Sequence, residues 1–397
     1  MYTPNLSEFP EFSLERLLVT CFGHTPSANL KTCILIDLPD LSLMSEKKFL
    51  DQNGFQVQKY AHDVFLRLLD EGVSEKMGYA SNDFFAFKTT GGSNLDPEDE
   101  LVDCEGNSFT FTEDICPNYD LILAITDFSL TAPLTAMAKV HGFRGATLHG
   151  VNDIILNSGL SVDYHMVSKQ AELFRSILTQ SDAFELDFET LGSEFNLRIE
   201  CEAQEAQKSH GLCPPGKPDV ANLPAGEVYF VPKGASGTFP FRFSDGTIAA
   251  MKVTDGAIVE ASLLRGDAEL VKSRNQQLMQ DPATGLIGEL GFGTQLLPFS
   301  GKDIQDEKIL ATCHVATGRS DHLGGSLTPE LFNSRENASH DDILYAPPKT
   351  PEIIVSQVRM YKNGEVFPIL ENYEPTPFLL EKLEPEYPVE KFASGVS

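Results

Sequence analysis

Residues 120–152, DLILAITDFSLTAPLTAMAKVHGFRGATLHGVN, contain two short apolar segments separated by a segment with helical spacing. DLILAIT (120–126) and FRGATLHG (143–150) are apolar enough to be buried strands. The segment between them ends at Gly142, and glycine commonly ends a helix. A strand, a helix and a second strand in this order are typical of a parallel sheet covered by helices.

The same alternation continues towards the N-terminus and beyond residue 152. LLVTCF (17–22) and CILIDL (33–38) are predicted to be strands, and residues 60–69 and 165–181 are predicted to be helices. These elements predict a Rossmann-like α/β domain with a parallel sheet over residues 1–188. No GxGxxG motif follows the first strand, so we do not expect a dinucleotide site.

From about residue 189 the sequence changes to alternating strands punctuated by SDG and TDG turns. One helix is predicted in this part, from Ala268 to Met279. We therefore predict a β-rich domain over residues 189–372. Residues 373–397 are predicted to form a C-terminal tail in which FLLEKL docks and the remainder is loose.

The composition disfavours several classes of partner. The chain has 30 Lys+Arg and 58 Asp+Glu, a formal net charge of −28, and no stretch rich in basic residues. We therefore expect no binding to nucleic acid or to an anionic membrane. No apolar run reaches the roughly 18 to 20 residues needed to cross a bilayer, and the acidic first fifteen residues are unlike a signal peptide. Together with seven cysteines that include no CxxC pair, this predicts a cytoplasmic protein.

Three local patterns in the β-rich half indicate chemistry. In the strand-like run SHDDILYA, His340 and Asp342 share one face because successive side chains alternate, and Asp341 faces away. Glu289 lies among glycines in GELGFGT, and Glu227 opens the apolar strand in NLPAGEVYFVP. A carboxylate in apolar surroundings needs a partner, and a metal ion is one candidate.

Each pattern also has an ordinary structural interpretation. A Glu at a strand start often binds a backbone amide or a Lys, and runs of glycine usually mark turns. Taken together, two Glu, two or three His and one Asp supply five or six nitrogen and oxygen ligands, more than a single ion with open positions requires. Oxygenases that use 2-oxoglutarate place a second His after their HxD motif. Because no His follows Asp342, that family is disfavoured.

Four motifs, in order and spacing, resemble the aminopeptidase T or thermophilic metalloprotease family, which is leucyl aminopeptidase-like. The resemblance covers about residues 110–345, with 120–152 as its weaker N-terminal part. The motifs are NLPAGEV (222–228), GELGFGT (288–294), DEK (306–308) leading into CHVATG with His314, and HDD (340–342).

The resemblance implies a homodimer whose β-rich domain binds two divalent metals, such as Zn, Co or Mn. It places the metal ligands at Glu227, Glu289, His314, His340 and Asp342. The implied activity is that of an aminopeptidase, in which a metal-activated water attacks the N-terminal peptide bond of a small peptide. Either Glu227 or Glu289 would serve as the general base.

One position departs from the family pattern. The family has a Tyr a few residues after its first His, whereas this chain has Asp321 and His322 there. His322 is therefore a substitute ligand, a catalytic acid or base, or a loop residue without a role in the site.

Two other functions stay open. The same superfamily resemblance includes 2,5-dihydroxypyridine dioxygenase, in which one Fe(II) ion held by a His and a closing HxD motif opens an aromatic ring with O2. His314, His340 and Asp342 would suffice for such a site. The third hypothesis is a non-catalytic binding protein with the same fold that recognises a small molecule.

Overall fold

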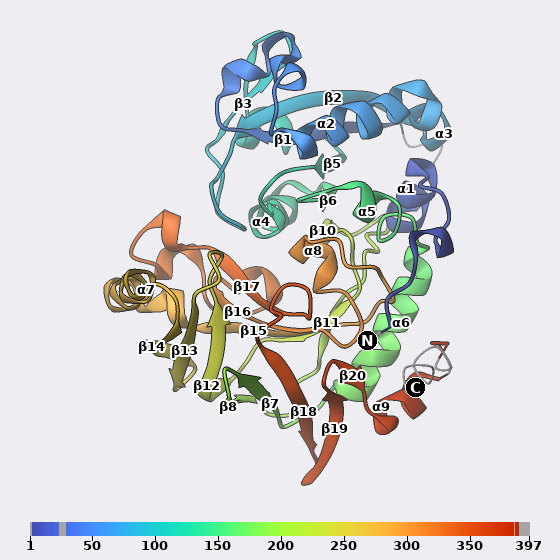
Figure 1. The fold of residues 1–397 in the computed structure, drawn as a ribbon. Coiled ribbons are helices and arrows are strands. Elements are labelled where there is room, and N and C mark those ends of the chain that lie inside the picture. Colours follow the sequence, from blue (N-terminus) through green and yellow to red (C-terminus); the bar gives the residue numbers. More distant parts are fainter. Residues whose placement is uncertain (1, 24–28, 385, 389–397) are drawn as a thin grey trace. The chain divides into compact units, whose positions relative to one another are not determined.

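The computed structural model describes residues 2–23, 29–384 and 386–388, and its chain divides into two units (Figure 1). The N-terminal unit consists of Asn5–Ser168 and His210–Ala225. The C-terminal unit consists of Lys169–Ser209 and the chain from Gly226 onward, together with the residues up to Pro4.

This division differs from the single boundary predicted at residues 188/189. The chain leaves the N-terminal unit at Ser168, within helix α6 (Tyr164–Leu178), and returns to it for His210–Ala225. The return has a structural cause, because β10 (Asp219–Asn222) adds a parallel strand to the sheet of the N-terminal unit beside β6 (Arg144–Thr147).

The sheet of the N-terminal unit has seven strands in the order β10-β6-β5-β1-β2-β3-β4. The first five are parallel to one another, and β3 and β4 are antiparallel at one edge. The sheet is therefore mixed, and the predicted Rossmann-like arrangement stays a prediction. The remaining strands are β5 (Leu121–Ala124), β1 (Leu30–Leu38), β2 (Tyr79–Lys88), β3 (Glu100–Asp103) and β4 (Ser108–Thr110).

Helices connect these strands. The predicted helix at residues 60–69 is part of a longer helical region that includes two π-helical segments, Ala61–Leu66 and Leu69–Val73. The α-helices of this unit are α1 (Leu14–Phe22), α2 (Gln56–Tyr60), α3 (Ser74–Met77), α4 (Thr131–His141) and α5 (Asp153–Leu156).

The predicted strand at residues 17–22 is wrong, because this segment belongs to helix α1. Ser13 begins the helix by accepting a hydrogen bond from the backbone N–H of Arg16. Leu14, Leu17, Leu18 and Cys21 are all buried, and their spacing places them on one side of the helix.

The C-terminal unit contains two antiparallel sheets. The five-stranded sheet has the order β17 (His340–Tyr345), β16 (Cys313–Gly318), β15 (Ile287–Gly293), β11 (Glu227–Phe230) and β9 (Gln207–Ser209). The eight-stranded sheet has the order β14 (Ala257–Arg265), β13 (Ile248–Thr254), β12 (Gly234–Arg242), β8 (Ser193–Glu200), β7 (Ala183–Thr190), β18 (Ile354–Lys362), β19 (Glu365–Glu371) and β20 (Glu374–Pro375).

The two sheets of this unit share one hydrophobic core. Phe184 of β7 contacts Phe230 of β11 and Phe292 of β15, with ring centroids 5.1 and 5.4 Å apart. Phe188 lies 4.7 Å from Tyr345 of β17. Because these contacts join strands of different sheets, the sheets pack face to face.

Three helices of the C-terminal unit complete the description. They are α7 (Ala268–Gln280), α8 (Asp303–Asp306) and α9 (Pro377–Leu383). Helix α9 contains the predicted docking segment, and its Leu379 and Leu383 are buried in the core. The end of the predicted loose tail, residues 389–397, lies outside the described residues.

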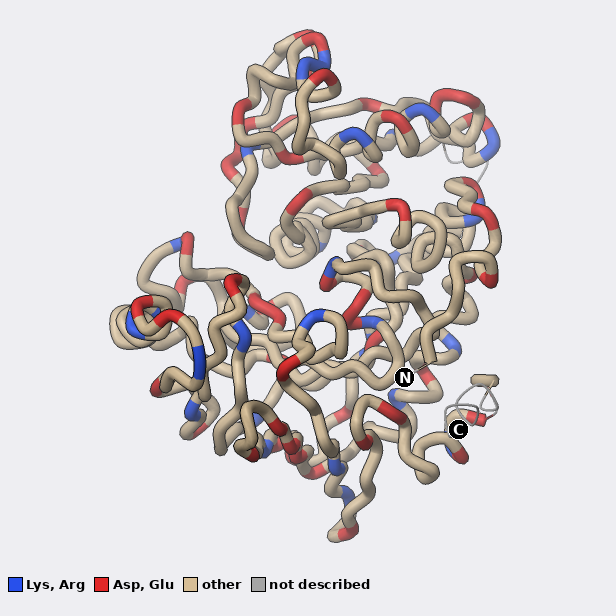
Figure 2. Tube along the Cα trace, viewed as in Figure 1, with Lys and Arg blue, Asp and Glu red and all other residues tan. Residues whose placement is uncertain are grey.

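Acidic residues occur along both units rather than in one segment (Figure 2). Among the residues that the structure describes, no helix is both long and apolar enough to cross a bilayer.

Replacing Phe184 with Ala tests the shared core. Phe184 is fully buried between the sheets, so Phe184→Ala is expected to lower the free energy of unfolding of the C-terminal unit by about 3–5 kcal/mol. Urea denaturation followed by circular dichroism measures this change. Val366→Ala on β19, where the side chain is 49% exposed, serves as the control and is expected to change it by less than about 0.5 kcal/mol. Equal effects of the two substitutions would contradict the described packing.

Candidate metal centre

Four adjacent strands place the predicted ligands on one face of the five-stranded sheet. Glu227 lies in β11, Glu289 in β15, His314 in β16, and His340 and Asp342 in β17. Side chains alternate along a strand, so neighbouring residues face the opposite side. Val228, Leu290 and Val315, each of which directly follows a predicted ligand, belong to the hydrophobic core, as does Tyr345 further along β17. One face of the sheet therefore carries the core, and the other carries the candidate ligands.

A β-bulge turns Glu289 onto the ligand face. Ile287 pairs with Thr317, and Glu289 pairs with Ala316, so Gly288 is an extra residue in β15. Ile287 packs into the core, although it lies two residues before Glu289 and would share its face in a regular strand. The bulge thus allows a core residue and a candidate ligand to occupy the same short strand.

The glycines of β15 leave room for other parts of the site. Gly291 pairs with His314 on the neighbouring strand. A Cβ atom at Gly291 would lie 2.1 Å from Cε1 and 2.2 Å from Nε2 of His314, closer than real contacts allow. The interpretation of this glycine run as a turn is therefore wrong. Gly291 is a strand residue whose missing side chain admits an imidazole ring.

The candidate ligand atoms converge in two overlapping groups among the described residues. Glu289, His340 and Asp342 form one, and Glu227, Glu289 and His314 form the other, with the atoms of each group within 4.8 Å of one another. The Nε2 atom of His340 lies 3.0 Å from Glu289 Oε2 and 3.3 Å from Asp342 Oδ1. The Nε2 atom of His314 lies 3.5 Å from Glu289 Oε1 and 3.9 Å from Asp342 Oδ1.

These separations suit ligands of one ion, since two ligand atoms that are each about 2.0–2.3 Å from a metal are roughly 3–4.5 Å apart. Glu289 is the shared member, because its two oxygens face different histidines. Asp342 keeps 27% of its side chain exposed on the edge strand β17. The cluster is therefore reached by solvent on that side.

The hydrogen bonds of His340 show that this cluster needs a cation or additional protons. Its Nδ1 atom lies 2.6 Å from the carbonyl oxygen of Arg319, and a carbonyl only accepts, so Nδ1 carries a proton. The neutral ring then presents a lone pair on Nε2 to the carboxylates of Glu289 and Asp342. Acceptors facing acceptors in a buried position repel one another unless a metal ion or a proton lies between them. The donor set therefore fits a metal ion.

The pKa shifts of the two histidines and of Glu289 also show that positive charge is favoured in this cluster. Burial alone would lower the pKa of His314, but hydrogen bonding to Glu289 and the charges of Glu289 and Asp342 raise it to about 9. The pKa of His340 is raised well above its usual value in the same way. Burial would raise the pKa of Glu289, but the two histidines lower it to about 2. Without a metal, this cluster holds extra protons at neutral pH.

A buried lysine occupies the side of the site next to Glu227. The Nζ atom of Lys308 lies 2.6 Å from Glu227 Oε1 and 2.5 Å from Glu307 Oε1, and its side chain is 1% exposed. Burial raises the pKa of Glu307 to about 8, although the charge of Lys308 opposes this shift. The other carboxylate oxygen of Glu227 lies 3.7 Å from His314 Nε2. Glu227 therefore joins the lysine to the candidate ligands.

His322 lies beside the cluster without belonging to either group of candidate ligands. Its ring centroid is 5.0 Å from that of His340 in an edge-to-face arrangement, and its side chain is 6% exposed. Burial lowers the pKa of His322, so the ring is neutral near pH 7. Asp321 forms a short ion pair with Arg319, with 2.7 Å between Nε and Oδ1.

The structure thus brings together all five predicted ligands and places His322 in contact with one of them. Sequence reasoning missed Glu307 and Lys308 as members of the cluster. Both belong to the DEK motif, but a run of charged residues is more often a solvated loop. Little in the sequence indicates that these two residues are buried, because composition alone does not show whether a charged tripeptide is buried or exposed.

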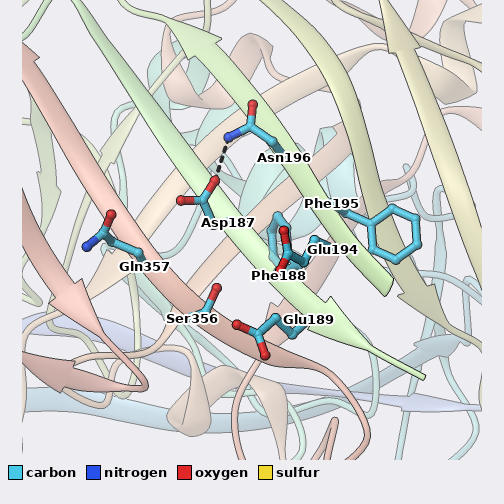
Figure 3. Close-up of a pocket in the computed structure, with 8 residues that line it drawn as sticks. All are labelled: Asp187, Phe188, Glu189, Glu194, Phe195, Asn196, Ser356 and Gln357. Carbon is cyan, nitrogen blue, oxygen red and sulfur yellow. Dashed lines mark hydrogen bonds between the residues drawn. The ribbon is translucent and has the colours of Figure 1, made fainter. Parts of the chain in front are cut away.

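A separate groove lies on the outward face of the eight-stranded sheet (Figure 3). It has a volume of about 460 Å³ and carries the carboxylates of Asp187, Glu189 and Glu194. Asn196 donates a hydrogen bond of 2.7 Å to Asp187. Its lining contains no histidine, so the groove lacks the mixed donor set of the metal centre.

Substituting Gly291 tests the placement of His314. Gly291→Ala introduces a methyl group where the imidazole lies, so His314 must move and the affinity for a divalent ion is expected to fall by roughly 10- to 100-fold. Isothermal titration calorimetry measures this affinity. Gly234→Ala in strand β12 is the matched control, because the nearest atom to its added Cβ is 3.8 Å away. Unchanged metal affinity in Gly291→Ala would show that His314 is not a ligand.

The stability of the metal-free protein is expected to fall as the pH rises from 6 to 9. Protonated His314 stabilises the fold fully below its unperturbed pKa of 6.5, and this contribution is lost as the pH rises through about 9. Ionisation of Glu307, whose pKa is raised from 4.5 to about 8, destabilises the fold over an overlapping range. Thermal melts in chelator measure the effect. Added divalent ion should raise the Tm most at high pH, where the ligands have lost their protons. A chelated protein that gains stability towards pH 9 would contradict these shifts.

Comparison with known proteins gives a likeness in the fold alone. No protein-family model matches the chain, and neither does any curated protein sequence. Among solved structures, the chain is similar to 2,5-dihydroxypyridine dioxygenase from Pseudomonas putida KT2440, with a TM-score of 0.54 and 12% sequence identity. The match covers 88% of this chain and 92% of that chain. At this identity the likeness concerns the fold alone.

Proposed function

We propose that this protein is a mononuclear Fe(II) dioxygenase that opens a small dihydroxylated aromatic ring. The observation that carries the proposal is that the Nε2 atoms of His314 and His340 approach the same oxygen, Asp342 Oδ1, at 3.9 and 3.3 Å. Two histidines and one carboxylate are the donor set of many non-haem iron sites that react with O2. The similar fold of 2,5-dihydroxypyridine dioxygenase supports the same assignment.

In this proposal the chain's own residues hold the ion and handle protons. His314, His340 and Asp342 would bind the metal, and Glu289 would lie between the two histidines as a further ligand or as their orienting carboxylate. A bound ferrous ion supplies the one-electron chemistry that O2 needs to react with an aromatic ring. We assign to His322, which is neutral and next to His340, the role of accepting a proton from a ring hydroxyl.

The alternative is the two-metal aminopeptidase that the motif resemblance implied. The second group of candidate ligands, Glu227, Glu289 and His314, favours it because it offers donors for a second ion. In that case two ions would activate a water, and Glu227 or Glu289 would act as the base. The homodimer and the cytoplasmic location implied by the sequence stay predictions under either function.

Metal content and paired assays distinguish the two functions. Protein purified without chelator and reconstituted with Fe(II) under anaerobic conditions is expected to hold one iron per chain by elemental analysis. It is expected to consume O2 when supplied with 2,5-dihydroxypyridine or a related dihydroxylated ring. Two zinc, cobalt or manganese ions per chain, with release of amino acids from dipeptides and no O2 consumption, would refute the dioxygenase proposal.

Two neighbouring aspartates test the ligand assignment. Asp342→Asn is expected to weaken iron binding by roughly 100-fold or more and to abolish O2 consumption, because it removes an anionic ligand. Asp341→Asn is the control. Asp341 is exposed on the opposite side of β17 and accepts a hydrogen bond from Ser339, so its loss should leave both quantities unchanged. Iron content and O2 uptake measured on both variants decide the matter, and equal losses would count against a specific role for Asp342.

A further inference from the structure

We infer that Lys308 limits this site to one metal ion, because its ammonium group provides Glu227 with the positive charge that a second ion would otherwise supply. The inference rests on the proposed one-ion site and adds a residue that determines its metal stoichiometry. Lys308 is outside the set of predicted ligands. Its position decides which of the two chemistries left open by the ligand set is available.

The contacts of Lys308 are those of a fixed cation. Its Nζ atom lies between Glu227 Oε1 at 2.6 Å and Glu307 Oε1 at 2.5 Å. Both carboxylates and the lysine are buried, with side chains 8%, 6% and 1% exposed. Water therefore contributes little to the solvation of this ammonium, and the two carboxylates take its place.

The backbone holds Lys308 in this position. Its carbonyl oxygen accepts a hydrogen bond of 2.8 Å from the N–H of Gln295, just after β15. The N–H of Leu310 donates to the carbonyl of Gln295 at 2.7 Å, and Gln295 forms an isolated parallel bridge with Ile309. Lys308 is thereby attached to the strand that carries Glu289. The side chain is held in the cluster by its contacts with Glu227 and Glu307.

The lysine and a second ion would compete for the same carboxylate. The oxygen of Glu227 that faces His314 is Oε2, and a metal bound to it at about 2.1 Å would lie within roughly 7 Å of the ammonium, which contacts Oε1 of the same carboxylate. Two cations at this distance in a buried site repel each other strongly. The second group of candidate ligands contains Glu227, so the lysine acts on the position where a second ion would bind.

The two carboxylates of the cluster that do not contact Lys308 match the charge of one divalent ion. Lys308 contacts Glu227 and Glu307, and its single positive charge leaves this pair with at most one net negative charge. Glu289 and Asp342, which face the two imidazoles, are the other two carboxylates. These two carry two negative charges, and one divalent cation neutralises both. Glu227 lies between the lysine and the candidate ligands, because its Oε1 contacts Lys308 and its Oε2 lies 3.7 Å from His314 Nε2.

Removing the charge of Lys308 is the direct test. Wild-type chain is expected to bind one Mn²⁺ or Zn²⁺ per chain in isothermal titration calorimetry and elemental analysis, and Lys308→Met is expected to bind two. Lys308→Arg, which keeps the charge, should bind one. Two ions in the wild type, or one in a folded Lys308→Met variant, would overturn the inference. No ion in the wild type would remove the metal centre itself, and the inference with it.

A second comparison does not depend on the folding of a lysine variant. Glu227→Gln is expected to change the affinity for the first ion by less than tenfold, because Glu227 is paired with Lys308 and only its Oε2 faces one histidine, whereas Glu289 faces both. Glu289→Gln is expected to weaken it by roughly 100-fold or more. Equal losses would overturn the role of Lys308 while leaving the metal site in place. If the wild type binds one ion but hydrolyses dipeptides without O2 uptake, the proposed function fails and the inference about Lys308 stands.

Discussion

The close approach of Glu289 and His340 is the contact on which the rest of the site depends. Glu289 Oε2 and His340 Nε2 lie 3.0 Å apart, and each side chain is only 5% exposed. The other nitrogen of His340 already donates its proton to the carbonyl of Arg319. The contact is therefore attractive only when a cation or an added proton is present on the Nε2 side. Strand pairing must hold these atoms together against the cost of burying their charges.

The free-energy cost of burying these charges is offset by the apolar core on the other face of the same sheet. The face opposite the ligands packs into a large apolar core, and rings such as Phe292 and Tyr345 join it to the eight-stranded sheet. A slip of one residue in any of the pairings would exchange apolar and ligand side chains, so the core also fixes the register of the ligands. The bulge at Gly288 is the one local irregularity that the ligand face requires of β15.

Where a strand is regular, its side chains alternate between the two faces of the sheet, and the facing of the candidate ligands could be predicted from the sequence. His340 and Asp342 do share a face in β17, and Asp341 is exposed. The bulge in β15 could not be predicted, because glycine is compatible with a turn, a bulge or close packing. Burial of Lys308 also depends on a distant carboxylate, Glu227, which local sequence does not reveal.

In the N-terminal unit, the secondary-structure predictions were right where a short apolar run was sufficient and wrong where residues outside that run decided the structure. The buried parallel strands β1 and β5 were recognisable as continuous apolar runs. LLVTCF looked similar, but the segment is a helix whose cap, Ser13, lies outside the apolar run. The early strand β2 was missed because it begins with the polar residues of YASND before its apolar half. Edge strands β3 and β4 make the sheet mixed, and they are too short to show a continuous apolar run.

A likeness of fold at 12% identity is compatible with either reaction, because the sheet needs to keep only a few side chains in register. Any sequence that preserves the alternation of β11, β15, β16 and β17 can present the same nitrogen and oxygen atoms. By our inference, a residue beside the candidate ligands, rather than the ligands themselves, controls the number of bound ions. In this chain, that neighbouring position is occupied by Lys308, a buried charge paired at 2.6 Å with one of the five predicted ligands. If Lys308 acts as we infer, the metal stoichiometry of the site depends on the charge of a residue that binds no metal.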